Sequence, residues 1–151
     1  MKRLMGLDFG AKTTGVALSD PLMMIASPLE TITRDKEGKI KPTLRRIIQL
    51  AAENEVEKIV LGLPLNMDDS RGERAEKTEG FKLELERRLE AEGLNIPVVL
   101  WDERLSTVGA DEILKEAEVP RSERKQYIDK IAASLILEDF IKNSREQRKG
   151  E

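Results

Sequence analysis

The apolar positions along the chain fall into short runs typical of strands and longer stretches at helical spacing. Runs at 4–9, 16–19 and 25–33 predict three strands, the first two joined by a Gly-rich turn over 10–15. Pro28, in the third run, is typical of an edge strand or a bulge. Two further short apolar runs, at 58–63 and 96–101, predict buried strands.

Apolar residues at helical spacing lie between and after these runs. They predict helices after Pro42, through 81–89, after Ser106 or Thr107, and from Ser122 to about Ile141. Three strands followed by helix, strand, helix, strand and two helices predict an α/β fold, with a mixed five-stranded sheet flanked by helices. We expect a single domain over residues 1–142 and a charged C-terminal tail over 143–151 that frays.

The residue types that the chain lacks exclude several kinds of catalytic and metal site. The chain has 151 residues, enough for one domain, and contains no Cys and no His. This excludes disulfides, Cys-based zinc sites, Cys nucleophiles and His bases, so catalysis would have to use carboxylates, hydroxyls, Lys or Arg. The net charge is -3 and no apolar run approaches the length of a membrane span. We therefore expect a cytoplasmic protein with no membrane partner and only local contacts with nucleic acid.

Acidic residues follow two of the predicted strands and interrupt one packed helix face. Asp8 ends the first strand, and Asp102 and Glu103 end the run at 96–101, so both sites fall at the edge where parallel strands finish. Asp129 shares a helix face with small and apolar residues, where an unpaired carboxylate is costly. Carboxylates without His suit Mg²⁺ or Mn²⁺, and two such ions can hydrolyse a phosphodiester. The sequence thus predicts Asp8 as a ligand that bridges two ions.

Each acid also has a structural interpretation when taken alone. Asp8 could cap the turn that follows it, and the pair at 102–103 could bind Arg104. Asp129 could pair with Lys125 or Lys130 at helical spacing. The convergence of all three at one predicted edge favours the functional interpretation.

Basic residues near these acids form a candidate phosphate-contacting rim, the alternative being that they are solvated surface charges. The rim comprises Lys12, Arg71, Arg74, Arg104, Arg121, Arg124 and Lys125, with Arg104 beside the acids as the strongest single candidate.

Four motifs, GLDFGAKTTGVALSD, IVLGLPLNMDDSRGERA, WDERLST and DKIAASLIL, occur in that order and resemble the YqgF (RuvX) family, which is similar to Holliday-junction resolvases. The resemblance covers nearly the whole chain. It implies an RNase H-like fold and a cytoplasmic, metal-dependent nuclease, a hydrolase acting on ester bonds, in maturation of the 5′ end of pre-16S ribosomal RNA. It places Asp8, Glu103 and Asp129 on the family's acidic positions.

The chain departs from the family pattern in two loops and one strand end. The family often reads Gly-Thr-Lys-Arg in the first turn and Met-Asp-Gly after the fourth strand, whereas this chain has Gly-Ala-Lys-Thr at 10–13 and Met-Asp-Asp at 67–69. Related resolvases carry an acid where the fourth strand ends, but here Gly62, Leu63 and Pro64 stand. The second carboxylate must then come from Asp102 or Glu103, of which the longer Glu103 is favoured.

Other functions stay open at this point. A Holliday-junction resolvase-like DNA endonuclease and a non-catalytic RNA-binding protein would both use the same fold. GLDFGAKTTG also resembles the first phosphate loop of actin-like and sugar-kinase ATPases, but these need a second lobe for which 151 residues leave no room, so no ATP binding is expected. RNA is favoured as the substrate over structured DNA, and a homodimer is left open.

Overall fold

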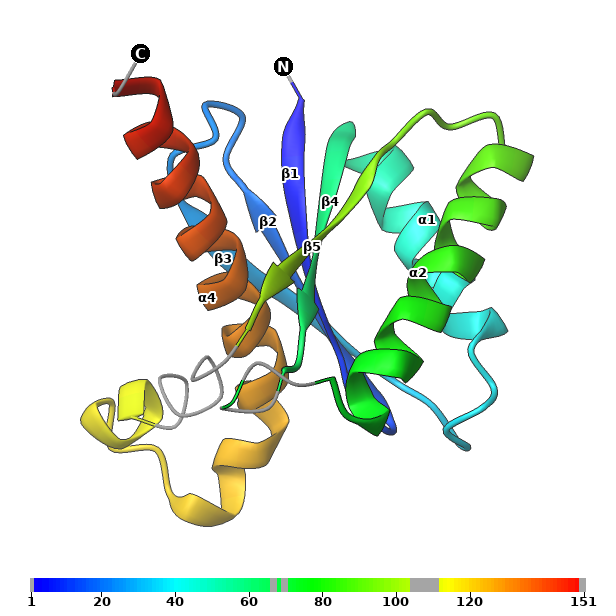
Figure 1. The fold of residues 1–151 in the computed structure, drawn as a ribbon. Helices are drawn as coiled ribbons and strands as arrows, with labels where there is room; N and C mark the ends of the chain where they lie inside the picture. The colour runs from blue at the N-terminus through cyan, green and yellow to red at the C-terminus, as the bar shows by residue number, and fades with distance from the viewer. Residues whose placement is uncertain (1, 66–67, 69–70, 104–111, 150–151) are drawn as a thin grey trace.

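The protein, described here by a computed structural model for residues 2–65, 68, 71–103 and 112–149, has helices on both faces of a mixed sheet (Figure 1). The strand order is β3-β2-β1-β4-β5. β1 pairs antiparallel with β2, and β2 with β3, whereas β1 with β4 and β4 with β5 are parallel. The predicted mixed sheet is confirmed, with strands β1 (Arg3–Phe9), β2 (Thr13–Ser19), β3 (Ala26–Thr33), β4 (Val56–Leu63) and β5 (Val98–Asp102).

The hairpin at the start of the chain is tighter than its sequence predicted. The Gly10 N–H donates to the Thr13 carbonyl at 2.7 Å, so β2 begins at Thr13 rather than at Val16. β3 lies at the edge of the sheet, and its register against β2 shifts between Val16 and Ala17, opposite Pro28. Both expectations for Pro28, an edge strand and a bulge, are therefore confirmed.

The helices are α1 (Lys41–Glu53), α2 (Glu73–Ala91) and α4 (Arg121–Lys149), and residues 112–116 are also helical. α1 begins with Pro42 in its first positions, as predicted. α4 continues past the predicted end at Ile141 to Lys149, whereas the fraying of the tail over 143–151 stays a prediction. The sequence from 121 to 149 contains no Gly or Pro, so nothing in the backbone interrupts the helix before that point.

Two hydrophobic clusters lie on opposite faces of the sheet. One, beneath α1 and α2, includes Met5, Leu7 and Phe81, and the other, beneath α4, includes Leu4 and Ile136. β1, β2 and β4 are buried on both faces, which explains why their sequences contain nearly continuous apolar runs rather than alternating ones, whereas the edge strand β3 is exposed or half-buried throughout. None of the helices in the described part of the chain is long and apolar enough to cross a membrane.

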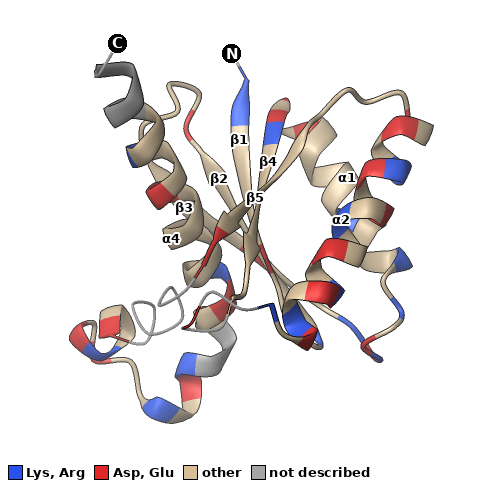
Figure 2. Ribbon diagram, in the orientation of Figure 1, with Lys and Arg blue, Asp and Glu red and all other residues tan. Residues whose placement is uncertain are grey.

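The three parallel strands finish at one edge of the sheet. β1 ends in Asp8 and Phe9, β4 ends in Gly62 and Leu63, and β5 ends in Asp102. Figure 2 shows acidic residues where β5 ends, close to the lower part of α4. The fold therefore brings the carboxylates that follow separate strands to a common position.

Candidate active site

Asp8 and Glu103 meet across β4 at this edge. Asp8 is the penultimate residue of β1, and Glu103 directly follows β5, where its N–H donates to the Leu63 carbonyl at 3.2 Å. The two carboxyl groups are hydrogen-bonded to each other, and both residues are half-buried. Glu103 thus contacts Asp8, whereas Asp102 is exposed.

The space for Glu103 exists because β4 carries a glycine at its end. A Cβ added to Gly62 would lie 2.4 Å from Glu103 Oε2 and 2.6 Å from Ile136 Cδ1. Any larger residue at this position would displace the carboxylate. From the sequence, Gly62 marks only a strand end that lacks an acid, and nothing in its residue type indicates a role in the site.

The two carboxyl groups do not ionise independently. Burial raises the pKa of Asp8, an effect that the hydrogen bond from Glu103 offsets in part and the charge of Asp129 reinforces. Burial, followed by the charge of Asp8, raises the pKa of Glu103 to about 9. The pair therefore retains a proton at neutral pH, as expected for two carboxylates that share one site.

Asp129 approaches the pair from α4, and its position is fixed from β2. Thr13 Oγ1 donates to Asp129 Oδ2 at 2.6 Å. A Cβ on Gly15 would lie 2.0 Å from the Asp129 carbonyl oxygen, so only glycine allows α4 to lie this close to β2. Lys130, one of the partners considered for Asp129, has its Nζ 5.3 Å from the centre of the Tyr127 ring. Thr13 and Gly15 are further residues of the site that the sequence analysis missed.

The donor set fits a hard divalent cation in its chemistry. All candidate ligands are carboxylate oxygens, and a bound cation would offset the burial and the neighbouring negative charge that raise the pKa values of Asp8 and Glu103. Within the described residues, however, no group of three or more Asp or Glu side chains is already gathered as a metal site. The predicted set is therefore present as a hydrogen-bonded pair with a third acid beside it, held by Thr13.

Of the predicted cationic rim, Arg74 lies at the acids. Its charge lowers the pKa of both Asp8 and Glu103, and its Nη2 donates to the Phe9 carbonyl at 3.1 Å. Its Nη1 donates to Glu37 at 2.6 Å.

The remaining rim residues are distributed more widely. Lys12 and Arg121 are exposed, Arg71 forms an ion pair with Glu79, and the Arg124 Nε donates to the Val119 carbonyl at 3.0 Å. Arg104 and the side chain of Lys125 lie outside the part of the chain that the structure describes.

A buried arginine that sequence analysis did not identify supports the first turn. Arg34 is 4% exposed and donates to Thr14 Oγ1 at 2.9 Å and to the carbonyls of Gly10 and Ala11. Its guanidinium also lies 4.5 Å from the centre of the Phe9 ring. Arg34 therefore fixes the turn that joins the strand of Asp8 to the strand of Thr13.

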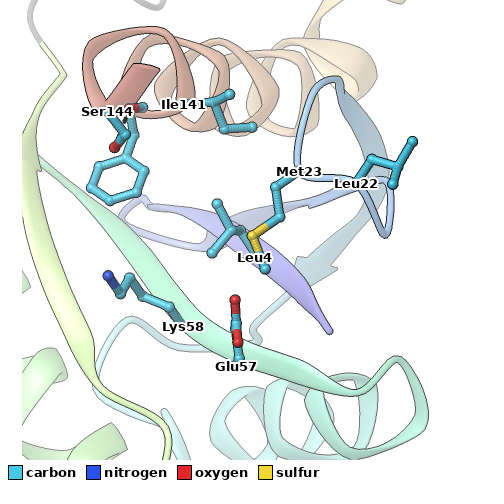
Figure 3. Close-up of a pocket in the computed structure, with 8 residues that line it drawn as sticks. Leu4, Leu22, Met23, Glu57, Lys58, Ile141 and Ser144 are labelled. Atoms are coloured by element: carbon cyan, nitrogen blue, oxygen red, sulfur yellow. Dashed lines mark hydrogen bonds between the residues drawn. The ribbon is translucent and has the colours of Figure 1, made fainter. Parts of the chain in front are cut away.

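A pocket of about 220 Å³ lies at the other end of the sheet and contains none of these acids. Leu4, Met23, Glu57, Lys58 and Ile141 line it, near the starts of β1 and β4 and the later part of α4 (Figure 3). It mixes apolar and charged groups and has no contact with the carboxyl ends of the parallel strands. The candidate active site is therefore the acidic edge.

Comparison with known proteins gives matches along nearly the whole chain. The family model described as "RuvX: Holliday junction resolvase" matches residues 2–143. A relative from Lachnospira eligens, named "Putative pre-16S rRNA nuclease", is 50% identical over 143 residues, covering 95% of this chain and 99% of its own. A relative of the same name from Listeria monocytogenes is 48% identical over 139 residues, covering 92% and 96%.

Solved structures resemble the fold at low sequence identity. RuvC of T. thermophilus, solved in complex with a Holliday junction substrate, has a TM-score of 0.54 at 15% identity, with 96% of each chain covered. The Holliday junction resolvase of fowlpox virus has a TM-score of 0.56 at 13% identity, with 93% of this chain and 99% of that chain covered. These two likenesses confirm the expected RNase H-like fold.

Proposed function

We propose that this chain, which belongs to the RuvX family, is a cytoplasmic nuclease that hydrolyses phosphodiester bonds during 5′-end processing of pre-16S ribosomal RNA. The observation that carries the proposal is the hydrogen-bonded Asp8–Glu103 pair, which lies where the parallel strands β1 and β5 end. The names of relatives 50% and 48% identical support the substrate. The likeness to resolvases supports a second candidate, cleavage of four-way DNA junctions, on the same site.

We assign Asp8, Glu103 and Asp129 as the residues that would hold Mg²⁺ or Mn²⁺. Two such ions, when bound, would supply the Lewis acidity that activates water and stabilises the leaving oxygen of a phosphodiester. The chain itself contributes the rest of the arrangement. Gly62 leaves room for Glu103, Thr13 orients Asp129, and the charge of Arg74 favours the ionised forms of Asp8 and Glu103.

Cleavage assays with matched variants test this proposal. The wild type should cleave single-stranded RNA carrying the 5′ leader of 16S rRNA in Mg²⁺ or Mn²⁺, more readily than it cleaves a four-way DNA junction. Asp8→Asn should abolish cleavage, whereas Asp102→Asn, which removes an exposed neighbouring charge, should leave it within a few-fold. Cleavage that persists in EDTA or in Asp8→Asn would refute the proposal, and RNA binding without turnover would indicate a non-catalytic RNA-binding protein.

Asp129→Asn separates a catalytic role for Asp129 from a structural one. An amide oxygen can still accept the Thr13 hydrogen bond, and a charge that destabilises ionised Asp8 disappears, so stability without metal should stay equal or rise. The same variant should lose cleavage and part of the stabilisation that Mg²⁺ or Mn²⁺ provides. Melting temperatures with and without metal, measured beside cleavage, decide between the roles. Full activity with an unchanged response to metal would exclude Asp129 from the site.

A further inference from the structure

The loop that joins β3 to α1 places a carboxylate on two cations at the border of the acidic site. Glu37 Oε1 accepts a hydrogen bond from Arg74 Nη1 at 2.6 Å and another from Lys77 Nζ at 2.9 Å. Arg74 and Lys77 lie near the start of α2, and Arg74 also binds the carbonyl of Phe9, the residue after Asp8. A single carboxylate oxygen thus accepts hydrogen bonds from both cations, of which Arg74 acts on the charge of the acids.

We propose that Glu37 occupies the place of a nucleic-acid phosphate, and that Arg74 and Lys77 form a backbone-phosphate subsite that opens when Glu37 leaves. This inference rests on the proposed function, because it supplies that site with a contact to the substrate strand. Arg and Lys bind carboxylate and phosphate oxygens through the same charge-assisted hydrogen bonds. A phosphate can therefore replace the carboxylate on both cations.

The contacts of Glu37 are of a kind that a substrate can displace. The side chains of Arg74, Lys77 and Glu37 are 36%, 40% and 39% exposed, so these are surface ion pairs, which contribute little to stability. The hydrogen bond from Lys77, ahead of that from Arg74, holds the pKa of Glu37 below its ordinary value, so the group stays anionic. Lys77 keeps a second partner, Glu73 at 3.0 Å, but the Glu73 side chain is 79% exposed.

Replacement of Glu37 by Gln tests this inference, because it should strengthen RNA binding rather than weaken it. Short fluorescein-labelled single-stranded RNA is titrated with Asp8→Asn protein, which should not cleave it, and binding is followed by anisotropy. Adding Glu37→Gln should tighten binding by about threefold to tenfold, because the phosphate no longer competes with a carboxylate. Adding Arg74→Gln and Lys77→Gln as well should erase the gain. Equal melting temperatures verify the fold, and Glu37→Ala should give the same tightening.

Glu84→Gln is the matched control, since Glu84 forms an exposed ion pair with Arg87 further along α2 and the charge change is the same. It should alter RNA binding by less than about twofold. Binding that is unchanged or weaker in Glu37→Gln, or strengthened equally in Glu84→Gln, would overturn the inference. If the Asp8→Asn protein binds RNA but Glu37→Gln does not tighten that binding, the inference fails and the proposed function stands. If the Asp8→Asn protein binds neither RNA nor a four-way DNA junction, with or without Glu37→Gln, both proposals fail.

Discussion

Gly62→Ala tests the placement of Glu103 without changing any carboxylate. The new Cβ would lie 2.4 Å from Glu103 Oε2 and 2.6 Å from Ile136 Cδ1. Non-bonded atoms prefer separations of about 3.5 Å or more, so the carboxyl group has to move by about one ångström. The two nearest atoms are the ends of flexible side chains, and the third, Glu103 Cβ at 3.1 Å, requires only a small shift near the backbone.

We expect this substitution to reduce activity far more than stability. Overpacking costs about 1–3 kcal/mol, and movable neighbours put Gly62→Ala near the lower limit, about 1–2 kcal/mol. A misplacement of about 1 Å can reduce the rate by about 10²-fold, here because Glu103 would lose its hydrogen bond with Asp8. Gly15→Ala should be more damaging to stability, since its Cβ would meet the backbone carbonyl of Asp129 at 2.0 Å.

Guanidinium unfolding would measure stability, and single-turnover RNA cleavage in Mg²⁺ would measure activity. Gly80→Ala is the control, because Gly80 is exposed in α2 and a Cβ there meets nothing within 4 Å. It should leave cleavage unchanged and raise stability by up to about 1 kcal/mol through helix propensity. Near wild-type cleavage by a folded Gly62→Ala protein would refute the reasoning, since Glu103 would then not need its observed position.

Substitutions at three other residues test the ionisation of the site and the contacts that support it. In the folded protein the pKa of Glu103 is raised to about 9, whereas in the unfolded chain it is near its ordinary value of 4.5. The stability that the bound proton contributes should therefore be fully present below pH 4.5 and should decline as the pH rises to about 9. Glu103→Gln should flatten this decline, measured as the free energy of unfolding in urea at a series of pH values. Thr13→Val should lose about 0.5–1.5 kcal/mol with the hydrogen bond to Asp129 and slow cleavage, while Thr13→Ser should retain both in melting and cleavage assays. Arg34→Lys should lower the free energy of unfolding by about 2–3 kcal/mol in guanidinium, because a Lys ammonium cannot make all the hydrogen bonds that Arg34 donates to Thr14 and the turn carbonyls. A loss below about 0.5 kcal/mol would mean that these hydrogen bonds do not hold the turn.

Apolar patterning was sufficient to predict the sheet, its flanking helices and the edge where the acids meet. Runs of buried residues identify strands; Asp8 lies near the end of one such run, and Glu103 comes shortly after another. Boundaries were harder to predict, because they depend on individual hydrogen bonds. The bond from Gly10 to Thr13 starts β2 early, and no sequence signal distinguished this tight turn from a longer Gly-rich loop.

The supporting residues of the site were beyond sequence analysis for a different reason. Gly62 has no functional group, and its role arises only from the carboxyl group that lies over it. Arg34 binds backbone carbonyls, whose direction is set by the folded turn rather than by residue type. Arg74 was named as one of several cations, but its position beside the acids depends on how α2 follows β4.

The close packing of α4 on β2 also determines when the candidate active site is completed during synthesis of the chain. Thr13 and Asp129, which are hydrogen-bonded, are separated by 116 positions in the chain. Contacts between such distant residues form late, because the entropy of closing the intervening loop has to be overcome first. A nascent chain that still lacks α4 carries Asp8 and Glu103 but not the third acid. The proposed nuclease would therefore lack its third candidate ligand until α4 has been synthesised and packs against β2.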